Sequence, residues 1–222
     1  MVEESTCVYC VKRPGLTRDH VPPKSFFPKP RPSDLITVPA CRSCNREAGK
    51  DEELFLAAFM FGEAGVSLAG KKLWDEKLHR MYDKNRGLRR RIAKSMHSVD
   101  IFTPGGVFLG RGLGVRLEEE RINRVVTKII RGLYYHEYQE ALSSSTEIMC
   151  HFAQQPSDLS PVEKIVDQLQ FGSRGWPDVF EYRFNRVEEK PEASIWLVRF
   201  FKTNVFWALS NIDLGYSKKD QT

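Results

Sequence analysis

Three residue types suited to phosphodiester chemistry occur within the first fifty residues of the chain. Asp19 and His20 are neighbours, and Asn45 follows at the expected start of a helix. Carboxylate and side-chain amide oxygens are ligands that a hard cation such as Mg²⁺ prefers. An imidazole titrates near neutrality and can take a proton from water. The three side chains together therefore indicate one-metal hydrolysis of a phosphate ester, provided that the chain folds them onto one another.

Two cysteine pairs of the form Cys-x2-Cys flank Asp19 and His20. The first pair is Cys7 and Cys10, and the second is Cys41 and Cys44. Each pair can present two thiolates to one face of a tetrahedral zinc ion at roughly 2.3 Å per Zn–S bond. Four sulfur ligands leave no open coordination position, so we expect a structural zinc that brings Asn45 back beside Asp19 and His20. The fifth cysteine, Cys150, stands alone and is expected to be a buried apolar residue.

The whole pattern resembles the HNH endonuclease family, the ββα-metal nucleases. Its parts are Cys-x2-Cys, then Asp-His-x-x-Pro, then Cys-x-x-Cys-Asn with a following Lys. In that family a β-hairpin and a helix surround the catalytic metal, often beside a four-cysteine zinc site. The run from Asp19 to Phe26 also looks like the corresponding stretch of the HNH domain in RNA-guided DNA nucleases. The resemblance covers residues 5–55 and implies a nuclease that cuts the backbone of nucleic acid.

Carried over to this chain, the resemblance implies a role for each residue. His20 would be the general base, and Asp19 and Asn45 would bind a catalytic Mg²⁺ or Mn²⁺ ion. Asp34 stands where the family usually has a middle Asn, which braces the loop and orients the histidine. An Asp can accept the same hydrogen bond from the imidazole, but it has no amide donor and its charge would raise the pKa of His20. This departure predicts slower turnover and leaves room for a member that does not cut.

Positive charge is concentrated in the same segment. Residues 1–50 hold nine Lys or Arg against five Asp or Glu, in a chain of 222 residues with a net charge of +5. Such residues contact phosphates and give affinity without sequence information. The alternative for each of them is an ordinary solvated charge. The candidates for nucleic-acid contacts are Arg18, Lys24, Arg42, Arg46 and Lys50.

The elements that must position these residues are short. Strand-like runs cover residues 16–21 and 35–38, and the prolines between them forbid a helix there. A helix is expected from Cys44 onwards, with apolar residues at helical spacing until glycines interrupt it. We therefore expect a zinc-stapled ββα-metal motif in residues 1–55.

Beyond this motif the sequence predicts an α+β chain without a recognisable family. A helical segment is expected over residues 56–98, with a helix at 71–97. Residues 99–222 are expected to form an α+β region that selects a target, dimerises or binds a partner. Its predicted elements are a hairpin over 99–116, a long helix over 118–142, a short helix over 161–169 capped by Ser160, and an antiparallel pair of strands over 179–187 and 194–209.

Composition bears on membrane contact, location and partners. No apolar run reaches the roughly 18 residues of a membrane span. The first residues lack the apolar core of a secretory signal, so a cytoplasmic protein with no membrane contact is expected. The expected partner is double-stranded DNA, with a homodimer as one possibility. Two alternatives stay open: the same chemistry on RNA, and a non-catalytic zinc module that binds nucleic acid or protein.

Overall fold

A short hairpin and two helices form the N-terminal part of the computed structural model, which describes residues 6–63, 67–103, 105–154 and 156–212. Strands β1 (Thr17–His20) and β2 (Thr37–Ala40) pair antiparallel, with Asp19 opposite Val38. Helices α1 (Arg42–Glu47) and α2 (Gly49–Glu63) follow. As expected from its prolines, the long loop between the strands holds only a single 3-10 turn, η1 (Lys24–Phe26).

The next segment is helical but is not the single helix expected over residues 71–97. It consists of α3 (Leu68–Leu73), the π-helical turn η2 (Trp74–Leu78), α4 (His79–Lys84) and α5 (Arg86–Ser95). The break falls at Asn85, whose side-chain oxygen accepts a hydrogen bond from Leu88 N at 3.0 Å. Asn85 is therefore the N-cap of α5, a position that asparagine favours.

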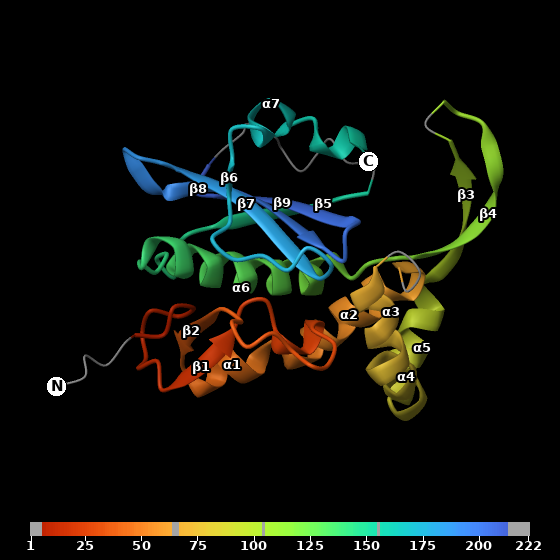
Figure 1. Cartoon of the computed structure of the whole chain (residues 1–222), viewed down its shortest axis with the longest axis horizontal. Coiled ribbons are helices and arrows are strands. Elements are labelled where there is room, and N and C mark those ends of the chain that lie inside the picture. The colour runs from red at the N-terminus through yellow and green to blue at the C-terminus, as the bar shows by residue number, and fades with distance from the viewer. Residues whose placement is uncertain (1–5, 64–66, 104, 155, 213–222) are drawn as a thin grey trace.

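The predicted hairpin over residues 99–116 is present as strands β3 (Met96–Phe102) and β4 (Phe108–Val115), which pair antiparallel. In Figure 1 this hairpin stands away from the body of the molecule. Several of its apolar side chains are exposed, among them Ile101, Leu109 and Leu113.

The C-terminal region combines one long helix with one antiparallel sheet. Helix α6 (Glu119–Tyr138) confirms the clearest helical pattern of the sequence. The sheet has the order β5-β9-β8-β7-β6. Its strands are β5 (Ile148–Ala153), β6 (Gln170–Phe171), β7 (Phe180–Val187), β8 (Lys190–Phe200) and β9 (Asn204–Ser210).

Two predicted elements of this region are wrong. Residues 194–209 are not one strand, because the chain reverses direction between β8 and β9. The helix predicted over 161–169 shrinks to α7 (Glu163–Val166), with Val162 rather than Ser160 at its N-cap and the 3-10 turn η3 (Pro156–Leu159) before it.

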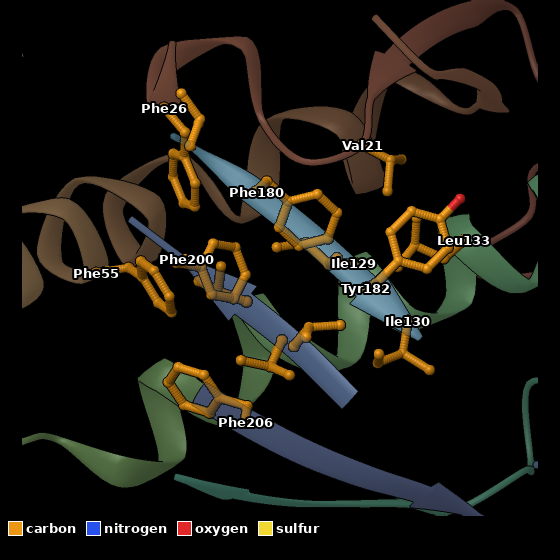
Figure 2. Packing of buried hydrophobic residues seen from close by; sticks show 14 of the residues in the cluster. Val21, Phe26, Phe55, Ile129, Ile130, Leu133, Phe180, Tyr182, Phe200 and Phe206 are labelled. Atoms are coloured by element: carbon orange, nitrogen blue, oxygen red, sulfur yellow. The ribbon is translucent and has the colours of Figure 1, made fainter. Parts of the chain in front are cut away.

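One hydrophobic core joins the N-terminal elements, α3, α6 and the sheet. Helix α6 lies between the sheet and the N-terminal elements (Figure 1). Figure 2 shows Phe26 and Phe55 from the N-terminal side packed with Phe200 and Phe206 from the sheet. The ring centroids of Phe55 lie 5.2 Å from Phe26 and 5.0 Å from Phe200. Each such buried ring contributes about 2–3 kcal/mol, so residues 1–55 depend on the rest of the chain for much of their stability.

None of the helices in the described ranges is both long and apolar enough to cross a bilayer.

Candidate functional site

The four cysteines of the two Cys-x2-Cys pairs come together at the base of the hairpin. The Sγ atoms of Cys7, Cys10, Cys41 and Cys44 all lie within 4.8 Å of one another. A tetrahedral zinc site with Zn–S bonds of roughly 2.3 Å requires sulfurs about 3.8 Å apart. The donor set and the spacing therefore fit a metal such as zinc, and four sulfurs would make it a structural site.

Local hydrogen bonds favour the thiolate form of Cys41, whereas burial and the neighbouring cysteines raise the pKa of Cys44. The Ser43 hydroxyl lies 3.2 Å from Cys41 Sγ. This contact, together with the backbone N–H of Cys44, lowers the pKa of Cys41 to about 6. A thiolate, not a thiol, is the metal ligand. Arg13 in turn donates a hydrogen bond to the Ser43 hydroxyl, which links the first cysteine pair to the second.

Asn45 lies against the start of β1. It sits in α1, and its amide nitrogen donates to Thr17 Oγ1 at 3.0 Å and to the carbonyl oxygen of Arg18 at 3.3 Å. The helix therefore meets the strand one residue before Asp19. Of the residues expected to act together, Asp19 and His20 lie within β1, and Asn45 lies against the end of the same strand that Thr17 and Arg18 form.

His20 is partly exposed, and no hydrogen bond joins its imidazole to the part of the chain that the structure describes. Burial lowers the pKa of His20, and the nearby charges of Lys24 and Arg31 lower it further, against an opposing effect of Asp19. This shift favours the neutral imidazole, which is the form that accepts a proton. Arg31 is held in place because its Nε donates to the Lys24 carbonyl at 2.9 Å.

Asp19 is almost fully buried, with 8% of its surface exposed. Its Oδ2 accepts a hydrogen bond from the Tyr9 hydroxyl at 2.9 Å and lies 2.8 Å from Lys128 Nζ. Its Oδ1 accepts from the backbone N–H of His20 at 2.9 Å. The donor types of Asp19 and Asn45 suit a hard divalent cation. With both carboxylate oxygens engaged, however, the arrangement does not present an open cation site at Asp19.

The position of Asp34 differs from the expectation. Its carboxylate accepts from Arg174 Nη1 at 3.0 Å and from Trp176 Nε1 at 3.4 Å, and the expected hydrogen bond to the His20 imidazole is not formed. Trp176 also packs edge-on against Phe27, with ring centroids 5.1 Å apart. Asp34 thus ties the loop between β1 and β2 to the C-terminal region instead of orienting the histidine.

The five candidate phosphate-binding residues all lie on the surface. Arg18, Lys24, Arg42, Arg46 and Lys50 are exposed, and none of them forms a salt bridge within the described ranges. These side chains can bind phosphates, and they can equally be hydrated by water.

Four residues near Asp19 and His20 were not predicted from the sequence: Lys128, Tyr9, Glu52 and Arg31. Lys128 lies three residues after Val125 and four before Gly132, both of which are buried in α6. A lysine beside the apolar stripe of a helix indicates that an acidic partner is buried next to it. The sequence offered this signal for Lys128.

Comparison of the chain with protein-family models, with curated proteins and with solved structures gave no match.

Proposed function

We propose that this protein hydrolyses phosphodiester bonds of nucleic acid, DNA in the first instance, as a nuclease of the ββα-metal type. One observation supports the proposal: the amide of Asn45 reaches from α1 to Thr17 and to the Arg18 carbonyl of β1, so a helix residue meets the strand directly before Asp19 and His20. The cysteine cluster supports it, because a zinc ion there would hold the helix start against the chain before β1.

His20 is the general base of the proposed reaction. It would take a proton from a water molecule as that water attacks phosphorus, and the bond from phosphorus to the leaving oxygen would break. The imidazole is partly exposed and is not engaged by another described residue, so a water molecule can reach it. Exposed cations such as Arg18, Lys24 and Arg46 would hold the flanking phosphates. Dependence on Mg²⁺ or Mn²⁺, which the resemblance implies, stays a prediction.

Plasmid nicking tests the proposal. Supercoiled DNA is incubated with zinc-loaded protein and either Mg²⁺ or Mn²⁺, and wild type is compared with His20→Ala. We expect nicking by the wild type and its loss in His20→Ala, with unchanged zinc content and circular dichroism. His79→Ala is the matched control, because His79 is an exposed histidine of α4 whose charge partner is Asp83. Equal nicking by wild type and His20→Ala would refute the role of His20.

A second candidate function is a non-catalytic zinc module that binds nucleic acid or protein. The observation that favours it is the engagement of Asp19 by Lys128. Such a module would retain DNA or RNA in a filter-binding assay and leave it intact under every metal condition. Single-stranded and double-stranded RNA, included beside DNA in both assays, decide the substrate class.

Two further expectations remain predictions. Sedimentation of the zinc-loaded protein decides whether it forms a homodimer. Fractionation of cells that express the protein decides whether it is cytoplasmic.

A further inference from the structure

A largely buried lysine holds the carboxylate that the proposed nuclease site would need. Lys128 Nζ in α6 lies 2.8 Å from Asp19 Oδ2 and 3.1 Å from Glu52 Oε1. The Lys128 side chain is 12% exposed, and the side chains of Asp19 and Glu52 are 10% and 16% exposed. Tyr9 completes the cluster by donating its hydroxyl to the same oxygen of Asp19.

The ammonium of Lys128 occupies a position that a cation between two carboxylates would take. A divalent ion bound to Asp19 Oδ2 would need an oxygen distance of about 2.1 Å. The ammonium already lies within hydrogen-bond distance of that oxygen, so the two positive charges cannot share it. At a separation of a few ångströms in a partly desolvated site, their repulsion is large compared with thermal energy.

Lys128 lines a groove that opens to solvent. A groove of about 600 Å³ runs between α6 and the junction of α1 and α2. Tyr9, Cys44, Asp51, Arg124 and Lys128 are among the residues that line it. A lysine side chain has four rotatable carbons, so its ammonium can swing into this groove while its backbone stays in α6.

We propose that Lys128 is a positioning residue that holds Asp19 and competes with a divalent cation for it. The resting state has the ammonium on Asp19 and Glu52, and a divalent ion reaches Asp19 only when Lys128 moves away. Lys128 therefore sets the metal affinity of the site. This role rests on the proposed function only in that it assigns Asp19 to the same site.

The test measures Mn²⁺ binding directly. Free Mn²⁺ is followed by its electron paramagnetic resonance signal during titration of zinc-loaded wild type and Lys128→Met. We expect Lys128→Met to bind one Mn²⁺ with a dissociation constant at least about tenfold lower than that of the wild type, because the competing charge has been removed. Lys72→Met is the matched control, since Lys72 is a half-exposed lysine whose partner is Glu76, and it should bind as the wild type does.

Two further variants distinguish the proposed role of Lys128 from an effect of misfolding. Lys128→Gln removes the charge but keeps a polar group of similar length, and it should show the same gain. Adding Asp19→Asn to Lys128→Met should abolish the gain, which a purely structural role of Lys128 does not predict. Unchanged Mn²⁺ affinity in folded Lys128→Met or Lys128→Gln would overturn the proposal.

The two proposals fail separately. A protein that never nicks nucleic acid but gains Mn²⁺ affinity in Lys128→Met would refute the nuclease and support the role of Lys128. A protein that nicks DNA with unchanged Mn²⁺ affinity in Lys128→Met would support the nuclease and refute the role of Lys128.

Discussion

Gly132 in α6 lies against Val21, the residue that follows His20. A Cβ atom added at Gly132 would lie 2.5 Å from Val21 Cγ2 and 3.1 Å from Val21 Cγ1. Carbon atoms pack at about 3.5–4.0 Å, so Gly132→Ala requires Val21 or α6 to move by about 1 Å. Val21 is 1% exposed and is followed by two buried prolines, so it has little freedom to move.

Two opposing free energies decide the effect of Gly132→Ala on stability. Overpacking a closely packed core costs about 1–3 kcal/mol. Replacing glycine by alanine inside a helix returns about 1 kcal/mol. We expect a net loss of up to about 2 kcal/mol in the free energy of unfolding, which lowers the melting temperature by up to about 4–8 °C for a chain of this size. Displacement of Val21 would also move His20, so nicking should fall as well.

Gly87→Ala is the matched control. A Cβ atom at Gly87 in α5 would meet only Asn85 Oδ1, at 3.5 Å, which is an ordinary contact. The same chemical change should therefore leave stability unchanged or raise it by up to about 1 kcal/mol. Thermal unfolding of the three zinc-loaded proteins, followed by circular dichroism, measures the difference. A Gly132→Ala protein as stable as Gly87→Ala would refute the close-packing argument.

Three further predictions concern the metal, an ion pair and a thiol. Cys41→Ser should lose the bound zinc and become sensitive to protease in its N-terminal segment, as measured by metal analysis and limited digestion. Arg174→Ala should cost only about 0–1 kcal/mol, because its pair with Asp34 is half-exposed; a double-mutant cycle in urea that gives more than this contradicts the estimate. Cys150 is half-buried rather than buried as expected, and desolvation by its surroundings raises the pKa of its thiol to about 11, so the thiol should stay protonated at pH 8 and react more slowly with Ellman's reagent in the folded protein than after unfolding.

Elements with a local signal could be predicted from the sequence. Strand β1 is bounded by Gly15 and Pro22, and α6 repeats apolar residues at three- and four-residue steps. In such segments the period of the hydrophobic pattern is enough to identify the element.

The turn between β8 and β9 had no local signal. Phe201 and Lys202 make it with positive φ angles of 49° and 71°, which such residues rarely adopt. Phe201 is fully buried, and its backbone N–H donates to the Val179 carbonyl at 2.9 Å. Tertiary packing therefore sets this turn, and a pattern that reads neighbouring residues cannot find it.

The candidate site likewise has residues that the sequence predicts and residues that it does not. Its cysteines, Asp19, His20 and Asn45 were found by residue type and spacing, because all of them lie in one short segment. Lys128 is remote in sequence, and its charge partner depends on how α6 docks against β1. The pairing of Asp34 with Arg174 has the same origin.

The C-terminal region is therefore part of the candidate site and is not simply attached to it. Helix α6 supplies the ammonium at Asp19 and, through Gly132, the close approach to Val21. The loop before β7 supplies Arg174, which fixes the loop between β1 and β2. A fragment of residues 1–55 would keep all four cysteines, yet it would leave Asp19 without its counter-charge and expose aromatic rings that pack against the sheet. A zinc ion would restrain only the base of the hairpin, whereas the position of Asp19 depends on Lys128, which the second half of the chain provides, as well as on Tyr9.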